Sequence, residues 1–238
     1  MKRTPQEQRN EFMSLLHLAH EPVGVSSADH DPPAGDLSPV PSACGLWRRA
    51  ERDALTAPAE AHGACRIGTH VMGFSLDGQD LHALGALVQT MTNAAYLKPD
   101  EASALPRLPV QRAWRYEPLK DADSAPDLVL LWVDARQMML VQEALGGAHW
   151  KSGTGLQTTG RPACAALALA YRNIEPVLSF GCAGMRTFTA IPDQYMLLVV
   201  PGVLIEGLCE ALSRTLSANA LVQSLYDEQK AKFETEIS

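Results

Sequence analysis

The sequence predicts an α/β protein with a mixed sheet and flanking helices. Two continuous apolar runs, at 128–133 and 195–200, are typical of strands buried on both faces. A one-faced helical pattern at 135–145 follows the first run and stops at Gly146 and Gly147. A chain of 238 residues can bury one large core without disulfide or metal staples, so we expect a single domain.

The chain opens with a helix signal. Thr4 can cap the helix, Pro5 suits its first position, and Glu7 completes a capping box. An apolar pattern with helical spacing then continues to about residue 20. The other elements expected in the first half are a strand at 22–26, a proline-rich loop at 28–42, a helix at 42–50, a strand at 54–57, a helix at 80–96 and a strand at 110–119.

In the second half the same reasoning gives a strand at 128–133, helices at 135–145 and 165–171, a strand-like run at 187–191, a strand at 195–200, and a C-terminal pair of helices at 201–212 and 218–233. The order of strand, helix and cysteine occurs twice along the chain. The single domain, 1–238, could therefore consist of two similar packed halves, at about 1–120 and 121–238.

The composition and charge of the chain exclude some classes of function. The net charge is −7 and the lysines and arginines are scattered, which argues against a nucleic-acid binder. No apolar run is long enough to span a membrane, and the polar start of the chain is unlike a secretory signal, so we expect a cytoplasmic protein. The last expected helix could pack on its own domain or on another copy through its apolar residues, Leu221, Val222, Leu225 and Phe233.

The five cysteines fall into two groups. Cys209 lies on an apolar helical stripe and is expected to be a core residue. The others lie at expected helix starts or in turns of small residues, as where Gly181 and Gly184 flank a cysteine: Cys44, Cys65, Cys164 and Cys182. Their spacing matches neither a zinc ribbon nor a ferredoxin run. In a reducing compartment, such cysteines indicate burial, metal binding or catalysis.

Thiolates are natural ligands of iron–sulfur clusters, so the leading hypothesis is an enzyme with a cluster of the 4Fe–4S type. Its expected ligands are Cys44, Cys65, Cys164 and Cys182. With three protein ligands, one iron stays open as a Lewis acid for hydrolysis, elimination or hydration of a small anionic substrate. Further candidates are Arg186 as a carboxylate fork, His62, His70 or His149 for proton transfer, and Lys151 with the following glycine-rich loop as an anion holder.

Two alternatives remain open. A complete four-cysteine cluster would carry electrons to a partner or sense redox state without a substrate. A metal-free enzyme could instead use Cys182 as a nucleophile with a histidine as its base. Each candidate side chain also has a plain structural interpretation, such as a surface salt bridge for Arg186 or a partly buried ring for a histidine.

The order of several short motifs resembles the ArCR-type family, domain of unknown function family 169. The motifs lie at 22–25, 42–44, 63–65, 126–130, 160–164, 181–186 and 196–201. The resemblance implies a cytoplasmic α/β protein of prokaryotic type with cysteines at some of these positions. Family members often carry an acidic residue in the segment that matches 192–195, where this chain has Gln194.

Overall fold

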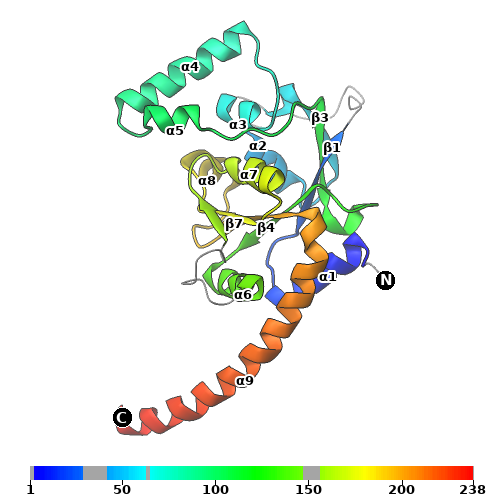
Figure 1. Ribbon diagram of the computed structural model, residues 1–238, viewed down its shortest axis with the longest axis vertical. Helices are drawn as coiled ribbons and strands as arrows, with labels where there is room; N and C mark the ends of the chain where they lie inside the picture. The colour runs from blue at the N-terminus through cyan, green and yellow to red at the C-terminus, as the bar shows by residue number, and fades with distance from the viewer. Residues whose placement is uncertain (1–2, 29–41, 63–64, 147–155, 238) are drawn as a thin grey trace.

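A mixed sheet of seven strands forms the centre of the part of the chain that the computed structural model describes, residues 3–28, 42–62, 65–146 and 156–237 (Figure 1). Its strand order is β2-β3-β1-β4-β7-β6-β5. The strands are β1 (Val23–Ala28), β2 (Leu55–Pro58), β3 (Ala113–Pro118), β4 (Leu128–Val133), β5 (Gln157–Thr159), β6 (Val177–Ser179) and β7 (Met196–Pro201). β5 and β6 pair in parallel, and the other neighbouring strands pair antiparallel. The predicted α/β class is confirmed.

Helices cover both faces of this sheet (Figure 1). One face carries α1 (Pro5–Leu16), α6 (Ala135–Gly146) and the first part of α9 (Ile205–Ile237). The other carries α2 (Ala43–Arg49), α3 (Arg66–Val71), α7 (Ala165–Asn173) and α8 (Ala183–Thr189). Beyond α3, α4 (Gly78–Asn93) and α5 (Pro99–Ser103) form a two-helix projection. Short 3-10 turns are η1 (Ala59–His62), η2 (Leu119–Asp121) and η3 (Gly202–Leu204).

Strand β4 shows why its apolar run is continuous. All six of its residues are buried, because alternate side chains enter two different cores. Leu130 and Trp132 pack in the core under α2 and α7, whereas Leu131 and Val133 pack in the core under α1, α6 and α9. The two halves of the chain meet here, since β4 pairs with β1 on one side and with β7 on the other. The division into two similar halves stays a prediction.

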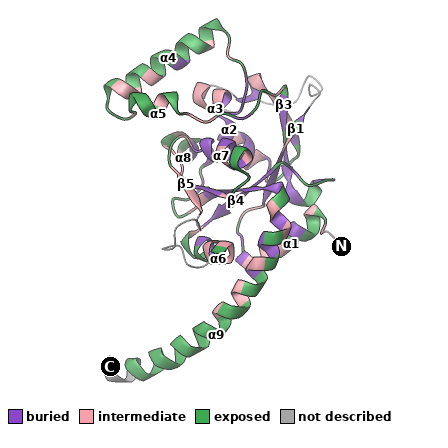
Figure 2. Cartoon of the chain, viewed as in Figure 1, coloured by how far each residue is buried: buried purple, intermediate pink, exposed green. Residues whose placement is uncertain are grey.

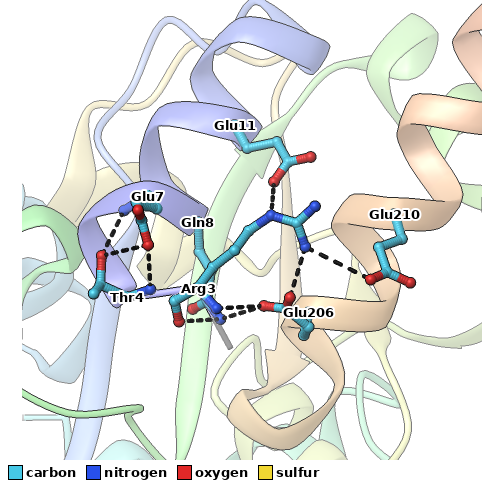
Figure 3. A network of polar contacts seen from close by, with 7 residues as sticks. All are labelled: Arg3, Thr4, Glu7, Gln8, Glu11, Glu206 and Glu210. Carbon is cyan, nitrogen blue, oxygen red and sulfur yellow. Dashed lines mark hydrogen bonds and ion pairs between the residues drawn. The ribbon is translucent and has the colours of Figure 1, made fainter. Parts of the chain in front are cut away.

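The N-terminal helix begins where the sequence predicts. The Thr4 side chain accepts a hydrogen bond from the Glu7 amide, and the Glu7 carboxylate accepts one from the Thr4 amide at 2.7 Å. Arg3 then joins this helix to α9, because its guanidinium lies 2.9 Å from Glu11 and 2.7 Å from Glu206 (Figure 3). The entry of the chain is therefore tied to its last helix by charge as well as by apolar packing.

Two local predictions are wrong. The expected C-terminal pair is a single helix, α9, because no glycine or proline interrupts the chain between 208 and 237. The run at 187–191, expected as a strand, falls largely within α8. Its β-branched residues follow a helix start at Cys182, whose side chain caps the first turn, and this cap outweighs their weak preference for strand.

The distal part of α9 differs from the body in how far its residues are buried. Figure 2 shows this segment as mostly exposed, in contrast to the buried sheet. Within the described residues, no helix combines the length and the apolar character needed to cross a membrane. Most of the proline-rich loop predicted at 28–42 lies outside the described residues, as 29–41 are not described.

Candidate four-cysteine site

Four helices present a cysteine at their first turn. Cys44 follows the cap of α2, where the Ser42 hydroxyl accepts a hydrogen bond from the Gly45 amide. The other three are the N-cap residues of their helices: Cys65 for α3, Cys164 for α7 and Cys182 for α8. Unpaired amides and the helix dipole favour negative charge at this end of a helix. The first turn is thus a setting that supports thiolate.

The four cysteines are electrostatic neighbours. Burial raises the pKa of the Cys44 thiol well above its usual range, and negative charge on Cys182 and Cys65 raises it further. Burial does the same to the pKa of Cys164, which Cys44, Cys65 and Cys182 also raise. The folded chain therefore gathers residues from four separate segments, and it does so on the sheet face that carries α2, α7 and α8.

The site has a buried side and an open side. Cys44 and Cys164 are only 6% and 3% exposed, whereas Cys65 and Cys182 are partly exposed. The pKa of Cys65 is also raised by burial, and the positive charge of Arg66 offsets part of this rise. The Sγ atom of Cys182 accepts a hydrogen bond from the Met185 amide at 3.4 Å.

The donor set fits an iron–sulfur cluster in chemistry, being all sulfur. Among the described residues, no group of three or more His, Cys, Asp and Glu is arranged to hold a metal ion. Each thiolate of a cluster binds a different iron, so cluster ligands stand farther apart than the ligands of a single ion. The arrangement therefore differs from a compact zinc site, and the cluster stays a prediction.

A buried polar pair lies beside the cysteines. His62 Nδ1 is 2.8 Å from the Pro58 carbonyl, which can only accept, so this nitrogen carries the proton. Nε2 then accepts a hydrogen bond from the Tyr116 hydroxyl at 3.0 Å. Burial raises the pKa of Tyr116 well above its usual range, and negative charge on Cys44 and Cys164 raises it further. The phenol is thus a neutral neighbour of the two most buried cysteines.

Two histidines were expected to titrate near neutral pH, and the structure assigns them different settings. Burial lowers the pKa of His62 to about 4, which disfavours a charged ring near neutral pH, and a proton-transfer role for His62 stays a prediction. His70 is partly exposed in the last turn of α3, and burial together with the charge of Arg107 lowers its pKa. A base role for His70 stays a prediction.

Arg186 braces the backbone around α8. Its Nη1 donates to the Pro192 carbonyl at 3.1 Å, and its Nη2 donates to the Phe180 carbonyl at 3.0 Å. These bonds tie the two loops that flank α8 and occupy the fork predicted to hold a substrate carboxylate. His149 and Lys151 lie outside the described residues, so their predicted roles stay predictions.

Sequence reasoning missed three neighbours of the cysteines. Arg66 directly follows Cys65, and its Nε lies 2.5 Å from Asp80 Oδ1, which fixes a cation at the open side. Trp47 is fully buried one turn after Cys44, and its indole lies close enough to Tyr116 to lower the pKa of that phenol. Tyr116 is the third. The adjacency of Arg66 and the one-turn spacing of Trp47 were readable, but the position of Tyr116 depends on strand pairing.

Cys209 is confirmed as a core residue. It is fully buried in α9, and burial raises the pKa of its thiol to about 12. Its neighbours in the same core include Leu208 and Leu212, as the apolar stripe predicts. The chain thus keeps one inert cysteine on the opposite sheet face from the other four.

These features define an α/β protein with a mixed seven-stranded sheet and four interacting cysteines at helix starts on one face. The family model for Uncharacterised ArCR, domain of unknown function 169, matches residues 11–211. The chain belongs to this family, which confirms the resemblance noted in the sequence. A curated relative, Uncharacterized protein MJ0308 of Methanocaldococcus jannaschii, is 28% identical over 175 residues, covering 69% of this chain and 72% of the relative. No solved structure matches the chain.

Proposed function

We propose that the chain is an iron–sulfur protein whose cluster, of the 4Fe–4S type, is held by cysteines at four helix starts. The ligands are Cys44, Cys65, Cys164 and Cys182. The observation that carries this proposal is that the four cysteines lie on one side of the sheet. Cys44, Cys164 and Cys182 belong to the core under α2, α7 and α8, and a Cβ atom at Gly68 would lie 3.3 Å from Cys65 Sγ and 3.7 Å from Cβ of Ala43, the neighbour of Cys44. Burial raises the pKa of Cys44, Cys65 and Cys164, so these thiols would lose their protons on binding iron rather than before it.

The exposure of the ligands supports an enzyme. The two buried cysteines, Cys44 and Cys164, anchor one side, and the partly exposed Cys65 and Cys182 face an open side. A bound cluster with an open iron supplies a Lewis acid for hydrolysis, elimination or hydration. Arg66 lies next to Cys65, and a small anionic substrate would have to compete with Asp80 for its guanidinium.

The complete set of four thiols also favours a second candidate. If all four bind iron, no coordination position stays open, and the protein would transfer electrons or sense redox state. The deep burial of two ligands suits this role, because low solvent exposure is one of the factors that set a cluster's potential. The number of ligands therefore separates the two candidates.

The deciding experiment is iron and sulfide analysis of anaerobically purified protein, together with its visible spectrum. We expect iron and acid-labile sulfide in about equal amounts and a brown colour. Four single variants to serine, at Cys44, Cys65, Cys164 and Cys182, should each be compared with Cys209→Ser as the matched control. If three variants lose the cluster and one keeps it, the open-iron enzyme is supported, and if all four lose it, the closed cluster is supported.

Colourless wild-type protein that lacks both iron and sulfide, even after anaerobic reconstitution, would sink both candidates. Thermal unfolding of each variant separates loss of the cluster from loss of the fold. The Cys209→Ser variant should retain full iron content, because its side chain lies in the other core.

A further inference from the structure

We propose that the C-terminal arm of this chain, residues 214–237 of α9, pairs antiparallel with the same arm of a second copy, centred on Leu221. The first part of α9 is held by the body through buried residues such as Ile205, Leu208 and Leu212. Near the start of the arm, Asn219 Nδ2 donates a hydrogen bond to Glu143 of α6 at 2.5 Å. Beyond this point the helix projects away from the body (Figure 1).

The arm exposes an apolar stripe that the single chain leaves uncovered. Leu221 is 72% exposed and Leu225 is 58% exposed, and further members of the stripe are also exposed: Val222, Tyr226 and Phe233. Their spacing of three, four and seven residues places them on one side of the helix. Helices in proteins gain most of their stability by packing such a stripe, so the arm needs a partner.

The helix of a second copy can lie along one face of α9, from the arm to the part that packs on the body. Four exposed residues lie seven positions apart along α9 and so mark one line: Gly207, Arg214, Leu221 and Glu228. A Cβ atom built at Gly207 meets nothing within 4 Å, so this line is open even where α9 is packed on the body. A second helix can therefore run beside both the arm and the body-bound part.

When two copies of this helix lie antiparallel, the charges along this line face charges of opposite sign. With Leu221 opposite Leu221 of the second copy, Arg214 of each copy lies opposite Glu228 of the other. A parallel pair in register would instead bring each of these charges level with its own kind. Flanking charges of this sort select orientation and partner in paired helices.

Acidic residues such as Glu228 border the stripe, which is unlike the Lys- and Arg-rich polar face of a membrane-surface helix. The self-complementary charges favour a second copy of this chain over an unrelated partner.

The test uses the full chain, with molar mass measured by sedimentation equilibrium across a range of protein concentrations. We expect wild-type protein to dimerise. Arg214→Glu and Glu228→Arg should each weaken dimerisation by about tenfold or more, because two attractive pairs become two repulsive ones. The double exchange, Arg214→Glu with Glu228→Arg, should restore dimerisation. Ala220→Glu, on the opposite side of the arm, is the matched control and should have no effect.

A monomeric wild-type protein at all concentrations would overturn the proposal. So would a dimer that survives both single reversals, or a double exchange that stays as weak as the single variants. Leu221→Asp, at the centre of the stripe, should abolish dimerisation, and its circular dichroism and unfolding transition report whether the body is intact. Iron and sulfide content should stay at the wild-type level in all of these variants, so the outcome is independent of the proposed cluster.

Discussion

The hydroxyl of Tyr116 donates a hydrogen bond to Nε2 of His62 over 3.0 Å, although 54 positions separate the two residues in the chain. Both side chains are fully buried. The Pro58 carbonyl fixes the tautomer of the histidine from its other side, so the order of donors and acceptors is determined. This buried pair is uncharged, and its phenol interacts electrostatically with Cys44 and Cys164.

Removing the phenol oxygen should destabilise the fold. In Tyr116→Phe, Nε2 of His62 is left buried without its hydrogen bond, which costs about 1–3 kcal/mol. The free energy of unfolding in urea measures this loss. Tyr96→Phe is the control, since it removes the same hydroxyl from an exposed side chain and should change stability by less than about 0.5 kcal/mol. Equal effects at both positions would contradict the assignment.

His62 should make stability depend on pH. Its pKa is lowered from 6.5 to about 4 by burial, so between these values the unfolded chain binds more protons than the folded chain. The stabilisation is complete above pH 6.5 and is lost as the pH falls through this window, by up to about 3 kcal/mol. We expect the free energy of unfolding of wild-type protein to fall more steeply from pH 7 to pH 4 than that of His62→Gln. Parallel curves would refute this origin.

Gly181 should not tolerate a side chain. Its φ is +93°, and a Cβ atom there would lie 2.4 Å from Cε of Met185. Gly181→Ala should cost about 1–3 kcal/mol and, by displacing the start of α8, should lower iron content if Cys182 is a ligand. Gly85→Ala is the matched control, because nothing lies within 4 Å of the added atom and helical alanine is favoured by about 0.5–1 kcal/mol. A Gly181→Ala variant as stable as wild type would rule out this constraint.

Arg3 should hold α1 against α9. Its guanidinium contacts Glu11 and Glu206, and its backbone amide lies 3.3 Å from Glu206 (Figure 3). In Arg3→Gln the two carboxylates lose their shared cation, so hydrogen exchange should accelerate in residues 5–16 before it does in the sheet. Raising the salt concentration should have the same effect on wild type and little on the variant. Unchanged exchange in α1 would show that apolar packing alone holds this helix.

Much of the fold could be read from the sequence because its signals are local. The capping box at Thr4 and the doubly buried β4 run are both confirmed, since each depends on neighbours within a few residues. The division of α9 into two helices was wrong because no glycine or proline interrupts the chain from 208 to 237, and Leu216, between the two expected helices, packs against the core. Because the distal part of α9 projects from the body, the sequence pattern at 218–233 resembled that of a separate helix.

The site was only partly readable. Local context placed Cys44 and Cys164 at helix starts, and the structure confirms both positions. The partners of His62 could not be found, because the contact with Tyr116 is set by the packing of η1 against β3 rather than by spacing. The backbone partners of Arg186 could not be found for a similar reason, since its bonds run to two carbonyls in loops whose paths the sequence does not specify, and its substrate role stays a prediction.

The family match ends at residue 211, just before the arm leaves the body. Selection can therefore act on two parts of one helix in different ways. Up to Leu216, the apolar positions of α9 that pack on the common core are constrained by it and should change slowly among relatives. Beyond it, relatives that lack a second copy have no reason to keep Leu221 apolar, so lineages should gain or lose this assembly without disturbing the cysteines on the far side of the sheet.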